Sequence, residues 1–199
     1  MKIEVQKWFN DGGDNKFRYN YHLNEKSLVF DCGGYKGEWS EKIYNLYSCN
    51  IFIFEPIKKY YNIIEEKFKN NNKVKVFNFG LSDMDKSIKI TLSDDGSSIY
   101  INSGIKELIE LRGISNFIND NEVRNINLLK LNVEGEEYNI LDDIIKNGLT
   151  DIVDNYQIQF HEVVENYDNL RKNIREVLNK THNETYCYEY VWENWEKKI

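Results

Sequence analysis

The chain has 199 residues, of which 41% are hydrophobic and 30% charged, and its formal net charge is −7. This balance fits one folded domain and excludes an intrinsically disordered chain. The acidic charge argues against a nucleic-acid backbone as the substrate, because such binding is carried by clustered Lys and Arg.

The sequence also predicts where the protein works. We expect no membrane insertion, because no apolar run approaches the length of a membrane-spanning helix, and no secretion segment at the start. The three cysteines, Cys32, Cys49 and Cys187, are widely spaced and form no C-x-x-C pattern. They predict reduced thiols in a cytoplasmic protein rather than a disulfide framework or a zinc site.

The first part of the chain alternates short apolar runs with amphipathic segments. This β-α-β-α-β order predicts an α/β fold with a doubly wound, mostly parallel sheet and right-handed crossovers. After an N-terminal segment without a clear pattern (1–26), the predicted elements are a strand over Ser27–Asp31, a helix over Gly37–Tyr47, a strand over Asn50–Phe54, a helix over Ile57–Lys69 and a strand over Lys73–Phe79.

The second part of the chain predicts an inserted hairpin and further alternation, ending in a closing antiparallel strand. The hairpin consists of Ser87–Leu92 and Ser98–Ile101 around the turn Asp94–Gly96. The elements that follow are a strand over Glu107–Arg112, a helical turn over Phe117–Asn121, a strand over Asn127–Asn132, a helix over Tyr138–Lys146, a strand over Tyr156–Phe160, a helix over Asn166–Leu178 and the closing strand over Tyr186–Trp192.

The stretch Val29–Ser40 has the pattern of a nucleotide-cofactor loop: a buried strand, a glycine turn and a helix start. It departs from the dinucleotide fingerprint G-x-G-x-x-G, because Gly33 and Gly37 are four residues apart and Asp31 stands nearest the place of the first glycine. A carboxylate there repels a pyrophosphate but suits a cationic cofactor. The loop therefore favours S-adenosylmethionine over NAD.

Polar residues follow the other predicted strands, at the edge where ligands bind in doubly wound sheets. Glu55 comes 24 residues after Asp31 (55 − 31), near the offset at which an acid holds an adenosine ribose; the alternative is a helix-opening acid. Ser82 and Asp83 suit an adenine edge or, equally, an Asx-type turn.

Two further strand ends supply candidates for acid–base chemistry. His161 is the first candidate for a base that accepts the proton of a hydroxyl acceptor, and Glu134 is the second. A structural histidine at a strand end is the alternative for His161. Glu136 and Glu137 are expected to be ordinary acids in the first turn of a helix.

Five motifs together resemble the FkbM-type methyltransferases. They are Val29–Ser40, Phe54-Glu-Pro56, Gly80-Leu-Ser-Asp83, Leu128–Glu137 and Gln157-Ile-Gln-Phe-His161. The resemblance implies a class I, Rossmann-like fold, S-adenosylmethionine as the cofactor and O-methylation of a sugar or natural-product hydroxyl. On this basis the chain is expected to be a single methyltransferase domain, 1–199, with a cofactor-binding core over 27–162 and a C-terminal helix and strand over 163–199.

The resemblance and the strand-end pattern together define the expected site. The catalytic candidates are His161 and Glu134; the expected cofactor-binding residues are Asp31, Cys32, Gly33, Gly34, Gly37, Glu55, Pro56, Ser82, Asp83 and Asn132. Asn132 departs from the family pattern, which commonly has an aspartate there, and an amide is neither a carboxylate base nor a strong metal ligand. A divalent metal is therefore possible but not indicated.

The leading hypothesis is an S-adenosylmethionine-dependent O-methyltransferase acting on a saccharide, a glycan precursor or a similar small polar acceptor. The presence of Asn132 motivates a second hypothesis, a catalytically silent cofactor-binding or scaffold protein. An NAD-dependent oxidoreductase is the third, disfavoured by Asp31 and the glycine spacing. The sequence specifies neither the acceptor nor the oligomeric state.

Overall fold

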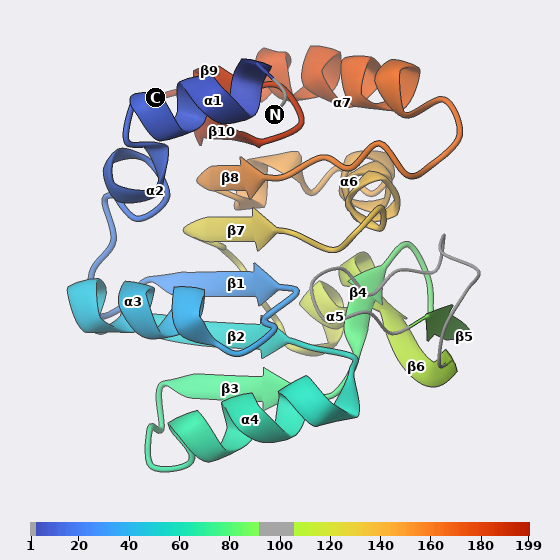
Figure 1. Ribbon diagram of the computed structural model, residues 1–199. Helices are drawn as coiled ribbons and strands as arrows, with labels where there is room; N and C mark the ends of the chain where they lie inside the picture. Colours follow the sequence, from blue (N-terminus) through green and yellow to red (C-terminus); the bar gives the residue numbers. More distant parts are fainter. Residues whose placement is uncertain (1–2, 92–105) are drawn as a thin grey trace.

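The computed structural model describes residues 3–91 and 106–199, and its centre is a seven-stranded sheet in the order β3-β2-β1-β7-β8-β10-β9. Five of these strands are parallel, with arrowheads pointing the same way in Figure 1, whereas β10 is antiparallel to both neighbours. The predicted mostly parallel sheet is thus confirmed, and antiparallel pairing begins at β10. The strands are β1 (Leu28–Cys32), β2 (Asn50–Phe54), β3 (Val74–Phe77), β7 (Leu128–Leu131), β8 (Asn155–Ile158), β9 (His182–Tyr188) and β10 (Trp192–Lys197).

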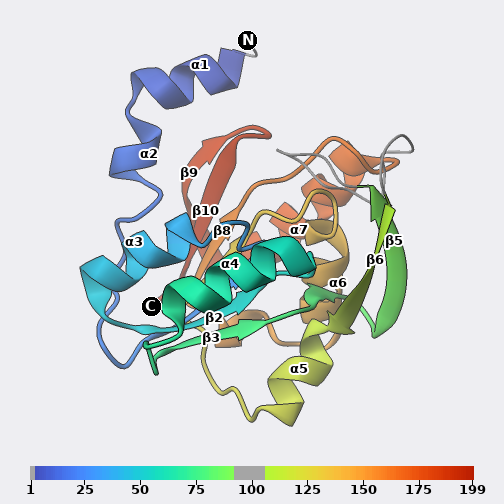
Figure 2. The same ribbon diagram turned by 60° about the horizontal axis from the view of Figure 1, so that its bottom comes forward.

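Helices cover both faces of the sheet, because successive side chains of each buried strand point to opposite faces. Val29 and Ile51 pack with residues of α3 and α4, whereas Phe30 and Leu129 pack with residues of α5, α6 and α7. Figure 2 shows α3 and α4 in front of the sheet and α7 behind it. The helices are α3 (Glu38–Tyr47), α4 (Lys58–Phe68), α5 (Ile114–Asp120), α6 (Glu137–Lys146), the 3-10 turn η1 (Thr150–Ile152) and α7 (Tyr167–Thr181).

A second, three-stranded sheet lies beyond the carboxyl ends of the parallel strands (Figure 1). In it β6 (Lys106–Gly113) is central, antiparallel to β5 (Lys86–Thr91) and parallel to β4 (Gly80–Ser82). Gly80 lets β4 approach β6 closely, because a Cβ atom at this position would lie 2.6 Å from Leu111 Cδ2. The insertion therefore packs against the edge where the predicted site residues lie.

Within the described residues of the insertion, the predicted strand over Ser87–Leu92 is present as β5 and pairs with β6. Glu107–Arg112 is a strand, and the expected helical turn is the longer helix α5. The predicted strand Lys73–Phe79 is wrong at its end, because β3 stops at Phe77 and the chain enters the second sheet at Gly80. The predicted turn Asp94–Gly96 and return strand Ser98–Ile101 lie outside the described residues.

The predicted closing strand over Tyr186–Trp192 is wrong, because this stretch crosses a tight turn. β9 ends at Tyr188, β10 begins at Trp192, and Tyr190 between them has a φ of 56°. The alternation of aromatic residues continues through the turn, so the pattern did not reveal it. The closing element is a hairpin of two strands.

The N-terminal segment forms two short helices, α1 (Ile3–Asn10) and α2 (Gly13–Lys16). Trp8 is buried and its ring packs against Phe17 and Tyr188, with centroid distances of 6.0 and 5.2 Å. These contacts attach the segment to the C-terminal hairpin. Among the described helices, none is both long and apolar enough to cross a membrane.

A buried ion pair joins the two central strands of the sheet. Asp31 of β1 and Lys130 of β7 are paired in register, and Lys130 Nζ lies 2.7 Å from Asp31 Oδ1. The Ser40 hydroxyl of α3 donates to Asp31 Oδ2 at 2.6 Å, and Lys130 Nζ also donates to the Gly33 carbonyl at 2.8 Å. One lysine thus fixes β1, β7 and the glycine loop together.

We expect Lys130→Met to lower the free energy of unfolding by about 3–5 kcal/mol, because it leaves the Asp31 carboxylate buried without its partner charge. Urea unfolding measures this change. Lys146→Met is the control, since it removes a lysine whose ion pair with Asp142 is exposed, and it should cost less than about 1 kcal/mol. Equal losses in the two variants would contradict the importance of the buried pair.

Candidate functional site

The candidate site lies at the carboxyl ends of β1, β2, β7 and β8, beside the second sheet (Figure 1). Parallel strands end at the same edge, so residues far apart in the sequence meet there. The structure brings together three groups: the glycine loop with Asn132 and Glu55, Ser82 and Asp83 with Glu136, and His161 with Glu134 and Glu137.

The glycine loop is held against the ends of β2 and β7. Gly33 has a φ of +82°, and a Cβ atom there would lie 2.0 Å from the Asn132 carbonyl oxygen, so no larger residue fits. The Gly33 and Gly34 amides both donate to the Phe54 carbonyl, at 3.0 and 3.4 Å. Gly37 directly precedes α3, so the loop leads into a helix start as expected.

Asp31 has a different environment from the one that the sequence argument assumed. That argument treated its carboxylate as an open charge facing a cofactor, yet the side chain is fully buried and both oxygens are bonded within the protein. Lys130 balances its charge. Asp31 therefore shapes the loop, and the preference for a cationic cofactor does not follow from its charge.

Cys32 and Pro56 contribute through their backbones. The Cys32 side chain belongs to the core, where burial raises the pKa of its thiol. The Cys32 carbonyl accepts hydrogen bonds from Lys130 Nζ and from the backbone N–H of Asn132. The Pro56 carbonyl accepts a hydrogen bond from Asn78 at 3.1 Å.

Asn132 has a buried side-chain oxygen without a hydrogen-bond partner in the structure. An unpaired buried acceptor at a strand end is a sign of a ligand-facing group.

Glu55 is a buried carboxylate, 4% exposed, at the end of β2. Its Oε2 accepts the Tyr35 amide at 2.8 Å and its Oε1 accepts the Ile57 amide at 2.9 Å. Burial raises the pKa of Glu55 to about 7, although these two hydrogen bonds oppose the shift. Glu55 thus connects the glycine loop to the end of β2, while its predicted role as the acid that holds a ribose stays a prediction.

Ser82 and Asp83 form a polar network with the start of α6. The Ser82 hydroxyl is buried and donates to Glu136 Oε2 at 2.5 Å, and it also lies 2.9 Å from Asp83 Oδ1. Lys86 Nζ lies 3.1 Å from Asp83 Oδ1 and 3.7 Å from Glu136 Oε2. Burial tends to raise the pKa of Asp83, but the hydrogen bonds from Lys86 and Ser82 lower it overall.

His161 lies between two carboxylates. Its Nε2 is 3.4 Å from Glu134 Oε1 and its Nδ1 is 3.1 Å from Glu137 Oε1. Burial alone lowers the pKa of His161, but the hydrogen bonds to Glu134 and Glu137 outweigh it and raise the pKa to about 9. The ring is therefore protonated at neutral pH. A protonated ring does not accept a proton, so this pKa disfavours the base role of His161, which stays a prediction.

The sequence missed three residues of this region. Glu136 and Glu137 are not ordinary first-turn acids, since they are 6% and 0% exposed and bind Ser82 and His161. Lys130 was not singled out, although a lone charge within the apolar run Leu128–Leu131 was a usable signal. For the two glutamates, a position at a helix start gave no sign of burial.

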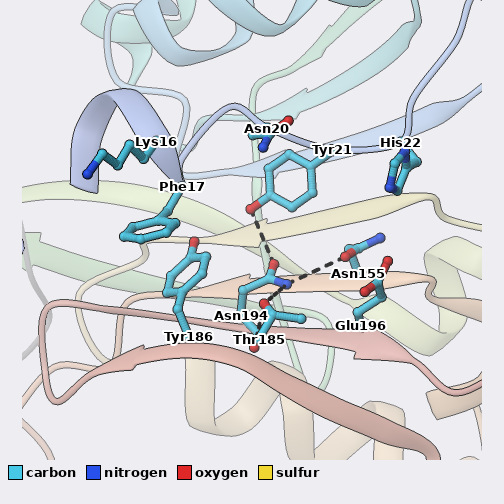
Figure 3. Close-up of a pocket in the computed structure, with 10 residues that line it drawn as sticks. All are labelled: Lys16, Phe17, Asn20, Tyr21, His22, Asn155, Thr185, Tyr186, Asn194 and Glu196. Atoms are coloured by element: carbon cyan, nitrogen blue, oxygen red, sulfur yellow. Dashed lines mark hydrogen bonds between the residues drawn. The ribbon is translucent and has the colours of Figure 1, made fainter. Parts of the chain in front are cut away.

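A cavity of about 220 Å³ lies elsewhere in the molecule, between the N-terminal segment and the sheet (Figure 3). The Asn194 amide bonds the Tyr21 hydroxyl at 3.2 Å and the Thr185 hydroxyl at 2.8 Å. Asn155, which also lines the cavity, begins β8, so the cavity lies towards the end of that strand opposite His161. We assign it to the packing of the N-terminal segment and not to the candidate site.

The described residues contain no group of three or more His, Cys, Asp or Glu side chains arranged to hold a metal ion.

A comparison with known protein families identifies the family of this chain. A family model described as the methyltransferase FkbM domain matches residues 31–186, which include the ends of β1, β2, β4, β7 and β8. The chain belongs to the FkbM methyltransferase family. The resemblance of the sequence motifs to this family is thereby confirmed. A comparison with curated proteins gave no match.

Solved structures share the fold of this FkbM domain at low sequence identity. A methyltransferase FkbM from Methylobacillus flagellatus KT has 15% identity and a TM-score of 0.59; the match covers 88% of this chain but only 44% of that one. A Streptococcus mutans protein in complex with SAH has 11% identity, a TM-score of 0.57 and coverages of 100% and 99%. An rRNA methylase from Streptococcus thermophilus has 12% identity, a TM-score of 0.51 and coverages of 89% and 90%. The fold is thus the Rossmann-like fold of class I methyltransferases.

The charge of His161 predicts how the stability of this FkbM domain depends on pH. Its pKa is raised from 6.5 to about 9, so the stabilisation is fully present below pH 6.5 and is lost as the pH rises through 9. We expect the wild type to lose on the order of 3 kcal/mol across this window relative to His161→Gln. Urea unfolding at a series of pH values measures this difference.

His182→Gln is the control for that series. Burial lowers the pKa of His182, so its titration lies below pH 6.5 and outside the window. The slope of stability against pH between 6.5 and 9 should match that of the wild type. Parallel curves for the wild type and His161→Gln would show that His161 is neutral in the folded protein.

Proposed function

We propose that this protein transfers a methyl group from S-adenosylmethionine to a hydroxyl of a saccharide, a glycan precursor or a similar small polar acceptor. The observation that carries the proposal is the buried Glu55 carboxylate beside the glycine loop, in a chain of the FkbM methyltransferase family. Three cysteines without disulfides support a reducing, cytoplasmic location.

The residues at the strand ends fit this cofactor. Each Glu55 oxygen accepts one backbone amide and keeps a further lone pair, so the carboxylate can also accept the two ribose hydroxyls. Gly33 and Gly34 let the loop pack closely against the Asn132 carbonyl and the Ile53 side chain, which sets the shape of the cofactor site. The unpaired Asn132 oxygen supplies an acceptor for the cofactor's ammonium group. When bound, the sulfonium of S-adenosylmethionine supplies an activated methyl group.

The remaining predicted residues have supporting roles in the proposal. Ser82 and Asp83 would face the adenine from the end of the short strand β4. Asp31 and Gly37 shape the loop through the Lys130 pair and the start of α3, and Cys32 and Pro56 contribute backbone atoms.

The charge around the site supports a small polar acceptor over a polyanion. Glu134 and Asp83 are partly exposed there, Glu136 lies behind them, and the whole chain carries a net charge of −7. A nucleic-acid backbone would be repelled, because its binding depends on clustered cations. We therefore propose no nucleic-acid acceptor, although the structural neighbours include proteins described as rRNA methylases.

The environment of His161 changes the order of the two catalytic candidates. A protonated ring cannot accept a proton, whereas the Glu134 carboxylate opposite Nε2 can. We propose that Glu134 accepts the proton of the acceptor hydroxyl and that His161 orients the carboxylate as a cation. Glu134 has a φ of 53°, an unfavourable conformation for a residue with a side chain, which the surrounding structure must maintain.

A second candidate function is a cofactor-binding protein without turnover. It is favoured by Asn132, which replaces the acid common in the family, and by the protonated His161. Cofactor binding does not distinguish the two functions, so turnover must decide between them.

We expect Glu55→Gln to weaken binding of S-adenosylmethionine and its demethylated product about 10- to 100-fold, because hydrogen bonds from the ribose to a charged acceptor are lost. Isothermal titration calorimetry measures both affinities. The control is Glu41→Gln, which removes an exposed carboxylate paired with Lys67 and should leave binding unchanged. Binding of NAD in place of either ligand would refute the proposed cofactor.

We expect release of the demethylated cofactor in the presence of one or more nucleotide sugars, measured by mass spectrometry with and without Mg²⁺. Glu134→Gln should reduce this turnover at least about 100-fold, because the proposed base is removed. Turnover on RNA but not on sugars would contradict the acceptor class. Tight cofactor binding without turnover on any acceptor would favour the silent protein.

A further inference from the structure

Glu137 is a fully buried carboxylate that connects two loops of the candidate site. Its Oε2 accepts the Gly135 amide at 2.9 Å, in the loop between β7 and α6. Its Oε1 accepts the His161 amide at 2.7 Å and lies 3.1 Å from His161 Nδ1. Both oxygens therefore have fixed partners, and Oε1 contacts both the backbone and the ring of one residue.

The two nitrogens of the His161 ring face different carboxylates, and this difference sets which nitrogen keeps its proton when the ring becomes neutral. Glu137 is completely buried and in contact at 3.1 Å, whereas Glu134 is 30% exposed and 3.4 Å away. A buried carboxylate without solvent holds the facing N–H more strongly. When the imidazolium loses a proton, it should lose the one on Nε2.

We propose that Glu137 is the positioning residue of the methyl-transfer site: it holds the His161 ring through the Nδ1–H, so that the Nε2–H is directed at Glu134 and the acceptor. This inference rests on the proposed function, since it assigns Glu137 a role in that same site. The structure assigns the role because no other carboxylate among the described residues contacts both the amide and the ring of His161.

Other charged or polar groups near the ring do not replace Glu137. Glu134 approaches from the loop after β7, and its Oε1 faces Nε2, on the other side of the ring from Glu137. The Tyr138 hydroxyl, on α6, donates to the His161 carbonyl at 2.9 Å and so fixes the backbone but not the ring. Glu136, the neighbour of Glu137, bonds Ser82 instead.

His182 provides an internal reference with the opposite arrangement. Its Nε2 lies 2.9 Å from the Val153 carbonyl, which only accepts, and its Nδ1 faces the Thr181 hydroxyl at 2.7 Å. The neutral ring of His182 therefore carries its proton on Nε2. The protein has three histidines, so both signals can be assigned in one spectrum.

The first test uses the wild-type protein without cofactor. Nitrogen-15 NMR of the histidine rings, recorded across a pH titration to about pH 10.5, reports both the pKa and the tautomer of each ring. We expect neutral His161 to carry its proton on Nδ1 and neutral His182 to carry it on Nε2. A neutral His161 with its proton mainly on Nε2 would overturn the inference.

The second test compares Glu137→Gln with Glu136→Gln, two neighbouring buried glutamates of which only the first contacts His161. Glu137→Gln should lower the pKa of His161 by at least about one unit, a tenfold change in protonation, whereas Glu136→Gln should change it little. Circular dichroism and thermal unfolding confirm that each variant is folded. Equal pKa values in the two variants would refute the role of Glu137.

Kinetics then separate this inference from the proposed function. Glu137→Gln should lower kcat about tenfold or more and leave the cofactor affinity unchanged, because Glu137 acts through His161 and not through the cofactor. An altered His161 titration with no turnover in any variant would leave Glu137 as its positioning residue but refute the methyl-transfer function. If the wild type turns over and Glu137→Gln has the same kcat, the positioning role is refuted while the methyl-transfer function stands.

Discussion

The ion pair between Asp31 and Lys130 is the interaction on which the candidate site depends. It lies between the two central strands, where neither charge is exposed, so the partners need each other to remain buried. Lys130 also bonds the Gly33 carbonyl, and Ser40 of α3 bonds the other Asp31 oxygen. These contacts fix the glycine loop to the sheet, and the position of the loop sets the shape of the site.

The same principle extends along the edge of the sheet, where each group of acids has its own cation. Lys86 balances Asp83 and Glu136, and His161 balances Glu134 and Glu137. Glu55 is the exception: within residues 3–91 and 106–199 it makes no ion pair, it is bonded by two amides, and its pKa is raised to about 7. A buried carboxylate that is only partly compensated is the group that gains most from a ligand with hydroxyl donors.

Much of the fold could be predicted because the relevant signals are local. The apolar run Asn50–Phe54 is a strand with the predicted bounds, and the glycine turn after Asp31 leads into a helix. The strand ends then placed Glu55, Glu134 and His161 at one edge. Prediction failed where one local pattern is compatible with two structures. The alternation over Tyr186–Trp192 fits a single strand, but in the structure it continues across the turn between β9 and β10.

The sequence by itself determined the order of strands and helices, the glycine loop and the residue types at the strand ends, because these follow from periodicity and turn chemistry within a few residues. Only the tertiary structure decided which of those polar groups are charged, buried or paired. Asp31 meets Lys130 across 99 positions of sequence, and His161 meets Glu137 across 24. Protonation depends on such neighbours and on exclusion of water, and neither is encoded in the spacing of residues along the chain.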